Sequence, residues 1–282
     1  MPELPEVEVL VRHLAPLVRN RTIRAVDVRR AKVVEPSSPR ALVRRLTGAR
    51  FTALERRGKY LHFQLRARGG EVFSVVGHLG MTGRMFLQPA RAPLPRHTAV
   101  ALDLGRLRFV YEDARYFGRF TLDAGPLEAL GPEPLAGEFT VDQFAAALAR
   151  SAQAIKVKLL DQSLVAGVGN IYASEALFRA GLSPRRAARR LRRDEIRRLH
   201  AAIRSVLAEA IACGSTIPLD FAGGRNGDRL FYFGRAAGAA DSYTERLLVY
   251  DRAGRPCSEC ATPIRRIVQA ARSTFFCPRC QR

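Results

Sequence analysis

The sequence lacks several features, and each absence excludes a class of protein. No stretch approaches the ~18 consecutive apolar residues of a membrane-spanning helix. The first eight residues contain Glu3, Glu6 and Glu8 but no basic residue, whereas a secretory signal needs a basic start and an apolar run. We therefore expect a cytoplasmic protein with no membrane partner. Apolar residues still make up 47% of the 282 residues, which excludes a wholly disordered chain.

Acidic residues are also scarce. The chain has 26 Asp and Glu against 47 Lys and Arg, which gives a formal net charge of +21. Only four of the cations are lysine, so 43 are arginine. An Arg-rich genome would explain this preference, but it would not explain the shortage of acids. The excess favours a polyanionic partner, for which nucleic acid ranks above an anionic membrane surface, so we expect nucleic acid as the partner.

The pattern of apolar and turn residues predicts an α+β protein built in successive parts. Residues 2–19 have the apolar spacing of a helix, and 22–124 have the short aromatic and β-branched runs of strands, which favours a sandwich or barrel. Residues 125–140 are rich in Pro and Gly. We expect an N-terminal β-rich domain (1–124), a linker (125–140), a helical domain (141–243) and a small terminal module (244–282). The helical domain is expected to contain a mobile loop at 214–242.

Four of the five cysteines form two C-x2-C pairs separated by 16 residues. This spacing is typical of a zinc site, because each pair can direct two thiolates at one tetrahedral ion. Two disulfides are the alternative, which a reducing cytoplasm disfavours. With four ligands and no open position, one structural Zn²⁺ is expected, and a β-hairpin should carry it. The ligands would be Cys257, Cys260, Cys277 and Cys280. Cys213 is expected to be a small buried apolar residue.

The opening MPELPEVE permits an unusual chemistry. Removal of the initiator methionine would leave Pro2 with a free secondary amine. Such an amine can attack a sugar C1′ and give a cationic iminium, which acts as an electron sink for elimination. Glu3 is adjacent and could move protons. A plain helix start rich in Pro and Glu explains these few residues equally well.

Further motifs occur in a fixed order along the chain. They are RRGKYL (56–61), HLGMTGR (78–84), EDARYFGR (112–119), LGPEPL (130–135) and LLDQSLVAGVGNIYASEALFRAGLSP (159–184), followed by the four cysteines. Together with MPELPEVE, they resemble the formamidopyrimidine-DNA glycosylase family, whose relatives include endonuclease VIII. The resemblance covers nearly the whole chain. Leu4 favours the formamidopyrimidine branch, since endonuclease VIII relatives usually have Gly there.

The resemblance implies a fold and a reaction. The fold would be an N-terminal β-sandwich with flanking helices, then a helix–two-turn–helix domain with a β-hairpin zinc finger, with DNA in the cleft between them. The enzyme would be a monomeric, nucleoid-associated bifunctional glycosylase and AP lyase acting on double-stranded DNA with oxidised purines or abasic sites. Pro2 would attack C1′ and Glu3 would handle protons, followed by β,δ-elimination. The same resemblance assigns further catalytic roles to Lys59, Arg272 and Glu6.

The resemblance also implies DNA contacts. A duplex hides the lesion, so the enzyme must extrude the nucleotide and fill the void. The void-filling residues would be Met81, Arg115 and Phe117, and the other DNA contacts would be His78, His97, Asn170 and Arg272. Asn170 also begins a helix after GVG, where a phosphate could bind or the residue could simply cap the helix. Arg265 and Arg266, on the expected zinc hairpin, are better explained as solvated surface charges.

Three alternatives remain at this stage. The segment 214–250 does not follow the usual family pattern where a loop covers the flipped base, and Ser151 and Tyr116 stand where basic residues are common. A glycosylase of the same fold for oxidised pyrimidines or other lesions is therefore open. A non-catalytic damage-binding paralogue is another, which the presence of Pro2, Glu3 and Lys59 disfavours. A zinc-ribbon transcription factor would bind duplexes by sequence and ignore lesions.

Overall fold

The computed structural model describes residues 2–214 and 246–282. These residues fold into two compact units. The first unit contains Pro2 and residues 6–128, and the second contains residues 3–5, 129–214 and 246–282. The predicted mobile loop at 214–242 lies almost entirely outside the described residues. Within the described ranges, no helix is long and apolar enough to span a membrane.

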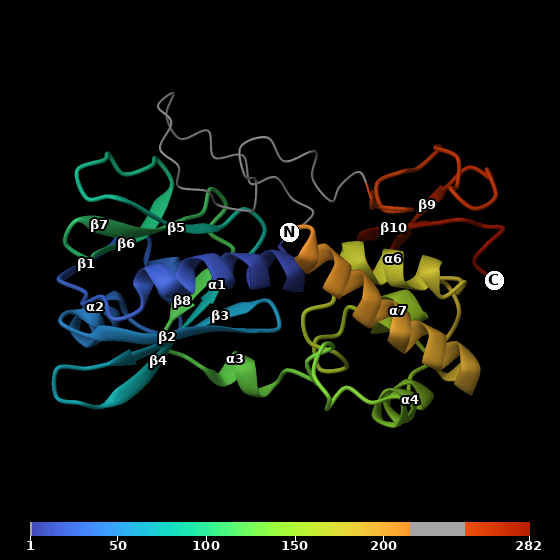
Figure 1. Cartoon of the computed structure of the whole chain (residues 1–282), viewed down its shortest axis with the longest axis horizontal. Helices are drawn as coiled ribbons and strands as arrows, with labels where there is room; N and C mark the ends of the chain where they lie inside the picture. Colours follow the sequence, from blue (N-terminus) through green and yellow to red (C-terminus); the bar gives the residue numbers. More distant parts are fainter. Residues whose placement is uncertain (1, 215–245) are drawn as a thin grey trace. The chain divides into compact units, whose positions relative to one another are not determined.

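The first unit is built on two four-stranded antiparallel sheets, β1-β6-β7-β5 and β2-β3-β4-β8 (Figure 1). Side chains alternate along the strands: Leu61, Phe63 and Leu65 of β3 are fully buried while the residues between them are half-buried. Helix α1 contributes Val7 and Leu14 to the same core. The strands are β1 (Ala25–Val28), β2 (Arg50–Arg57), β3 (Tyr60–Arg66), β4 (Val72–His78), β5 (Arg84–Pro89), β6 (Thr98–Asp103), β7 (Leu107–Glu112) and β8 (Arg119–Thr121).

Helices flank these sheets. They are α1 (Leu4–Val18), the 3-10 turn η1 (Ala31–Val34), α2 (Pro39–Leu46) and the short α3 (Gly125–Glu128). The sequence pattern missed α2, because only Leu42 and Leu46 of its eight residues are buried. Its start is nevertheless specified locally, since Ser38 accepts a hydrogen bond from the Ala41 N–H (3.1 Å) and Pro39 opens the first turn.

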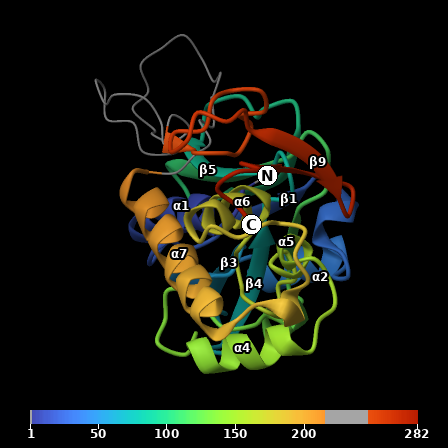
Figure 2. The same ribbon diagram turned by 90° about the vertical axis from the view of Figure 1, so that its right-hand side faces the viewer.

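The second unit is helical and ends in a two-stranded hairpin. Its elements are α4 (Val141–Ala149), α5 (Ile155–Lys158), α6 (Asn170–Arg179), the 3-10 turn η2 (Ala188–Arg190), α7 (Arg193–Ala212), β9 (Arg265–Gln269) and β10 (Arg272–Phe276). Figure 2 shows α7 alongside both α6 and α4. Gly181 and Gly214 follow the ends of α6 and α7 with φ of 69° and 82°, the left-handed conformation that glycine adopts where helices stop.

Three local expectations for this unit were wrong. The apolar periodicity of residues 155–162 predicts a helix over the whole segment, but the helix ends at Lys158, because the Asp161 carboxylate accepts the N–H of Ser163 and forms a turn (2.9 Å). The residue type of Asp194 predicts an N-cap for α7, but the N-cap is Arg192, whose N–H donates to Glu195 (2.8 Å). Cys213 is only half-buried, and its Sγ lies 2.8 Å from a guanidinium nitrogen of Arg246.

The predicted fold class is confirmed by these elements. Two antiparallel sheets with flanking helices form the first unit, and helices followed by a β-hairpin with a four-cysteine cluster form the second. Each unit has its own apolar core, which includes Phe63 and Phe109 in the first and Leu177 and Leu199 in the second. A smaller cluster, which includes Val249, Ile264 and Phe275, supports the hairpin.

Candidate functional site

The Glu3 carboxylate is seated on the N-terminus of α6. Its side chain is almost fully buried, and its two oxygens accept the N–H groups of Ile171 (2.9 Å) and Tyr172 (3.4 Å). These N–H groups belong to the first turn of the helix, where unpaired donors and the helix dipole favour a negative charge. The Leu4 N–H also donates to the Gly167 carbonyl (3.1 Å). The segment just after Pro2, itself buried, is therefore held against the loop before α6.

Gly169 makes room for this carboxylate. A Cβ at position 169 would lie 2.3 Å from Cδ of Glu3 and 2.4 Å from one of its oxygens. Such distances are far inside van der Waals contact, so only glycine lets the loop backbone approach the acid this closely. The close approach of Glu3 thus explains why position 169, the second glycine of GVGN, is a glycine.

Asn170 links three parts of the second unit. Its side-chain oxygen accepts a hydrogen bond from Nζ of the buried Lys156 (2.6 Å), and its Nδ2 donates to the Ser273 carbonyl (2.8 Å). The helix N-cap is Gly169, so the capping role considered for Asn170 is wrong. Instead the amide joins α5 and α6 to β10, directly beside the exposed Arg272.

Tyr250 belongs to the same group, although the sequence motifs did not single it out. Burial raises the pKa of its hydroxyl, and a hydrogen bond with the Asn170 side chain opposes that shift. The charges of Glu3 and Arg272 also act on this hydroxyl. Its ring packs edge-on against Phe275, with centroids 5.1 Å apart. The available signal was the aromatic residue in LLVYDR, shortly before the first cysteine.

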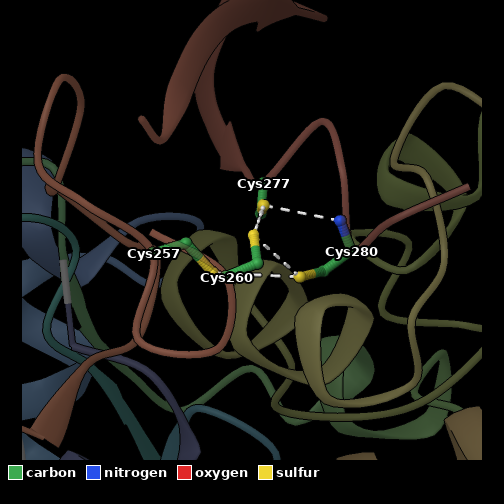
Figure 3. A group of neighbouring side chains, drawn as sticks. All are labelled: Cys257, Cys260, Cys277 and Cys280. Atoms are coloured by element: carbon green, nitrogen blue, oxygen red, sulfur yellow. Dashed lines mark hydrogen bonds between the residues drawn. The ribbon is translucent and has the colours of Figure 1, made fainter. Parts of the chain in front are cut away.

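The four cysteine sulfurs converge at the base of the hairpin (Figure 3). All four Sγ atoms lie within 4.8 Å of one another, and three of the separations are 3.9, 3.5 and 3.3 Å. A tetrahedral ion with Zn–S bonds of ~2.3 Å requires sulfurs about 3.8 Å apart. The Cys280 N–H also donates to Sγ of Cys277 (3.4 Å), as expected for a thiolate ligand. These residues fit the predicted structural zinc.

Glu175 fastens the chain entering this module to α6. Its buried carboxylate accepts the N–H groups of Leu248 (2.9 Å), Val249 (3.0 Å) and Tyr250 (2.8 Å). Burial raises the pKa of Glu175, and the three N–H donors oppose that shift. The helix therefore binds the terminal module at two points, through Asn170 near its start and through Glu175 one to two turns later.

In the first unit, Lys59 occupies the tight turn between β2 and β3. Arg57 pairs with Tyr60, so Gly58 and Lys59 form a two-residue turn, and Gly58 has a φ of 56°. Lys59 is 8% exposed. Arg56 steadies the turn by donating to the Gly58 carbonyl (3.2 Å) and to Glu8 of α1 (2.7 Å). Glu6, on the same helix, is completely buried.

His78 ends strand β4 next to this turn. Its Nδ1 accepts the N–H of Gly80 (3.1 Å), and its ring lies 4.8 Å from that of Tyr60. Burial lowers the pKa of His78 to about 4, with further lowering by the charges of Lys59 and Arg119. The imidazole is therefore neutral at physiological pH and carries its proton on Nε2, where it can donate a hydrogen bond.

The proposed void-filling side chains project from two turns. Met81 is 45% exposed and Phe117 is 49% exposed, which is unusual for large apolar residues in this fold. The guanidinium of Arg115 lies over the Phe117 ring, 4.7 Å from its centroid. His97 is half-buried, and its carbonyl accepts the Asp113 N–H (3.1 Å).

The predicted site residues thus fall into separate groups. Glu3, Asn170 and Arg272 come together with Tyr250 in the second unit, and Lys59 and His78 lie near one another in the first. Met81, Arg115 and Phe117 share a third group of paired turns. The functional roles of all these residues remain predictions.

Three family models match successive parts of the chain. The formamidopyrimidine-DNA glycosylase N-terminal domain matches residues 1–120, and the H2TH domain of the same glycosylase matches residues 130–220. A zinc finger found in FPG and IleRS matches residues 254–282. The last match supports the assignment of the four cysteines to one structural zinc ion.

Curated relatives and solved structures agree with these matches. A formamidopyrimidine-DNA glycosylase from Symbiobacterium thermophilum is 44% identical, covering 100% of this chain and 89% of the relative. Another from Paracoccus denitrificans is 43% identical, covering all of both chains. The Lactococcus lactis enzyme in complex with DNA containing N7-benzyl-Fapy-dG has a TM-score of 0.86 at 32% identity, with all of both chains covered. Because the family models and full-length relatives agree, the chain belongs to the formamidopyrimidine-DNA glycosylase family, as its motifs predicted.

Proposed function

We propose that this protein is a bifunctional DNA glycosylase and AP lyase that excises 8-oxoguanine and formamidopyrimidines from double-stranded DNA through Pro2. The family assignment supports the glycosylase activity on oxidised purines. Solved relatives include complexes with DNA that contains Fapy-dG, carbocyclic 8-oxo-G or an abasic site. The observation that carries the chemical proposal is the buried Glu3 carboxylate, held by two N–H groups of α6 beside the Pro2 backbone.

The proposed reaction uses the amine that Pro2 has once Met1 is removed. Its nitrogen bonds to C1′ of the damaged nucleotide, and the glycosidic bond breaks as the base leaves with the bonding electrons. Glu3 takes the proton that the Pro2 nitrogen loses on bonding and passes it to the ring oxygen, so that the sugar opens and the cationic iminium remains. Loss of a C2′ proton then expels the 3′ phosphate, and a second elimination expels the 5′ phosphate. The α6 N-terminus keeps the carboxylate oriented throughout.

Recognition of the DNA backbone is proposed for residues from both units. Arg272 would supply charge to a phosphate and act in the δ-elimination, and Lys59 would act in the β-elimination. Neutral His78, Asn170 and Tyr250 would supply directed hydrogen bonds. Met81, Arg115 and Phe117 would enter the duplex and fill the space left by the extruded nucleotide. His97 would contact DNA and Glu6 would lie near the reacting sugar. We assign residues 1–124 to a catalytic domain that also contributes these DNA contacts. The remaining DNA binding is assigned to 141–243 together with the zinc module at 244–282, which carries Arg272.

The zinc ion has a structural role in this proposal. Cys257, Cys260, Cys277 and Cys280 would hold it, and four protein ligands leave no position for water or substrate. When bound, the ion fixes the hairpin that carries Arg272. The protein is proposed to act as a monomer at the nucleoid, where its DNA substrate lies.

Blocking the amine tests the role of Pro2. An N-terminal tag that stays attached converts the amine into an amide, which cannot form an iminium. We therefore expect no borohydride-trapped adduct with an abasic duplex and no strand cleavage, whereas the same tag at the C-terminus leaves both intact. Full trapping by protein whose N-terminal tag is verified by mass spectrometry would contradict the proposal.

The lesion preference needs a separate measurement. Excision is compared on duplexes that carry 8-oxoguanine, formamidopyrimidine or thymine glycol. Faster removal of the two purine lesions supports the oxidised-purine assignment, whereas faster removal of thymine glycol would favour the oxidised-pyrimidine alternative. Binding to all three duplexes without trapping on any abasic duplex would favour the non-catalytic alternative.

A further inference from the structure

Two exposed turns of the first unit meet at a single buried carboxylate. The first turn, residues 79–83, carries Met81, and the second turn, residues 113–118, carries Arg115 and Phe117. We infer that Asp113 is a positioning residue that fastens these paired turns into one rigid wedge for base extrusion. This inference rests on the proposed function, because it assumes that the exposed side chains enter DNA.

Asp113 accepts hydrogen bonds from both turns. Its Oδ1 accepts from the Thr82 hydroxyl (2.6 Å) in the first turn and from the Arg115 N–H (3.1 Å) in the second. Its Oδ2 accepts the Gly118 N–H (2.9 Å), and the Tyr111 hydroxyl approaches at 3.4 Å. Asp113 is completely buried, so this charge is stabilised by the donors around it rather than by water. The Thr82 bond is the link between the two turns.

Glycines bring the two turns into backbone contact. A Cβ on Gly80 would lie 2.6 Å from the Gly118 nitrogen and 2.8 Å from the Phe117 carbonyl carbon. A Cβ on Gly118 would lie 2.0 Å from the Tyr111 hydroxyl and 2.3 Å from the His78 carbonyl oxygen. Three of these four atoms belong to the backbone, and the fourth is the hydroxyl of the fully buried Tyr111, so none of them can move aside cheaply. The turns are therefore packed as closely as two backbones allow.

The second turn also contains a strained residue. Tyr116 has a φ of 53°, a left-handed conformation that bulky residues avoid. Such a conformation persists only where the surroundings impose it. Asp113 does so by holding the N–H of Arg115 on one side of Tyr116 and that of Gly118 on the other. Because these two hydrogen bonds flank Tyr116 and Phe117, they also set the direction of the Phe117 side chain.

Rigidity at this place has a physical use. Unstacking a nucleotide costs free energy, which the inserted side chains must offset by contacts with the bases around the void. Side chains on loose turns would lose conformational freedom on insertion, which reduces the gain. A pair of turns that is already fixed inserts Met81 and Phe117 together at little further entropic cost.

Thr82→Val tests the link with little change in shape. It removes the hydroxyl that joins the turns but leaves the hydrogen bonds of Asp113 within its own turn. We expect single-turnover excision of 8-oxoguanine from a duplex to slow by about tenfold, the scale of one hydrogen bond to a charged group. The matched control is Thr52→Val, which also removes a partly buried hydroxyl bond, to the Gln64 carbonyl (3.0 Å), and should change the rate by less than about twofold.

Asp113→Asn is the stronger variant. In either orientation, the new amide nitrogen would face a backbone N–H, that of Gly118 or that of Arg115. A donor would then face a donor, so the loss should exceed that of Thr82→Val. If this variant does not fold, Thr82→Val alone decides the matter. Borohydride trapping on a single-stranded abasic oligonucleotide, which needs no extrusion from a duplex, should stay within about twofold of wild type for Thr82→Val.

A double-mutant cycle separates positioning from general damage to the fold. If Thr82 acts through Met81, Thr82→Val combined with Met81→Ala slows duplex excision no more than Met81→Ala alone. Multiplicative losses, or an unchanged rate in Thr82→Val, would overturn the inference.

A binding readout keeps this test independent of the chemistry. A duplex with a tetrahydrofuran abasic analogue and 2-aminopurine opposite it reports insertion at saturating protein without any reaction. We expect the fluorescence change to shrink in Thr82→Val but not in Thr52→Val. An equal change in both would overturn the inference, even if wild-type protein gave no trapped adduct and the catalytic proposal failed.

Discussion

At the residue scale, His78 shows how one backbone contact determines a side chain's chemistry. The Gly80 N–H donates a hydrogen bond to Nδ1, so the proton of the neutral ring must be on Nε2. Burial, and then the charges of Lys59 and Arg119, lower the pKa of the ring to about 4. Sequence motifs could nominate His78 as a DNA contact. They could not predict its protonation state, which depends on neighbours from the β2–β3 turn and β8.

A stability measurement tests the lowered pKa of His78. The unfolded chain takes up a proton at His78 near pH 6.5, whereas the folded chain resists it down to about pH 4. The stabilisation is therefore present above pH 6.5 and is lost as the pH falls toward 4, by up to roughly 3 kcal/mol. Urea unfolding of wild type and His78→Gln across this range should show a larger decline for wild type, and parallel curves would contradict the assignment.

Other residue-level expectations depended on what the sequence encodes locally. The four cysteine positions were predictable, because the ligand spacing is itself the signal. Tyr250 was missed, because its partners Asn170 and Glu3 are distant in sequence. Asn170 was identified, but its work as a link between Lys156 and Ser273 could only come from the fold.

At the element scale, both halves of α6 bind other parts of the second unit. Its first turn holds Glu3 and its buried Glu175 holds the chain that enters the zinc module. A helix of ten residues thereby joins the start of the chain to its terminal module. The helix was predictable from its apolar spacing, but nothing in the sequence indicated that its acid would pair with three backbone N–H groups.

Glu175→Gln should loosen the terminal module. One amide oxygen cannot accept all three N–H groups, and an unsatisfied buried donor costs about 1–3 kcal/mol. We expect faster hydrogen exchange at residues 248–250 and faster loss of zinc to a chelator. Glu209→Gln is the control, because its half-exposed carboxylate pairs with Arg179 at the surface (2.6 Å), where such pairs contribute at most about 1 kcal/mol. Equal effects in both variants would count against the docking role.

The strands and turns likewise include some features that the sequence indicated and one turn that it did not. Alternating burial made the strands of the first unit recognisable, and Gly58 marked the β2–β3 turn. The hairpin between β9 and β10 turns through Ala270 and Ala271, with φ of 45° and 58°. Two alanines are not a turn signature, so the four cysteines indicated this hairpin and the turn itself did not.

At the scale of the whole molecule, the excess of basic residues should appear in DNA binding. Each phosphate neutralised on binding adds ~0.9 to the slope of log affinity against log salt. Arg272→Gln should lower that slope by about this amount on an abasic duplex. The control, Arg265→Gln, removes an exposed charge from the neighbouring strand and should leave the slope unchanged. Equal slopes for wild type and Arg272→Gln would refute the phosphate contact.

Removal of zinc should separate DNA binding from the fold of the first unit. The metal module is terminal, and the core of the first unit contains none of its residues. Chelation is therefore expected to abolish tight binding to an abasic duplex while far-ultraviolet circular dichroism keeps its strand signal. Simultaneous loss of both signals at the same chelator concentration would contradict this independence.

Gly169 gives these observations a functional consequence. The acid beside Pro2 occupies the volume that any side chain at 169 would need. A substitution at this position would displace Glu3, the proposed proton donor, although Gly169 itself belongs to neither apolar core and is not part of the cysteine cluster. On the proposed mechanism, such a variant would bind damaged DNA and leave it uncut.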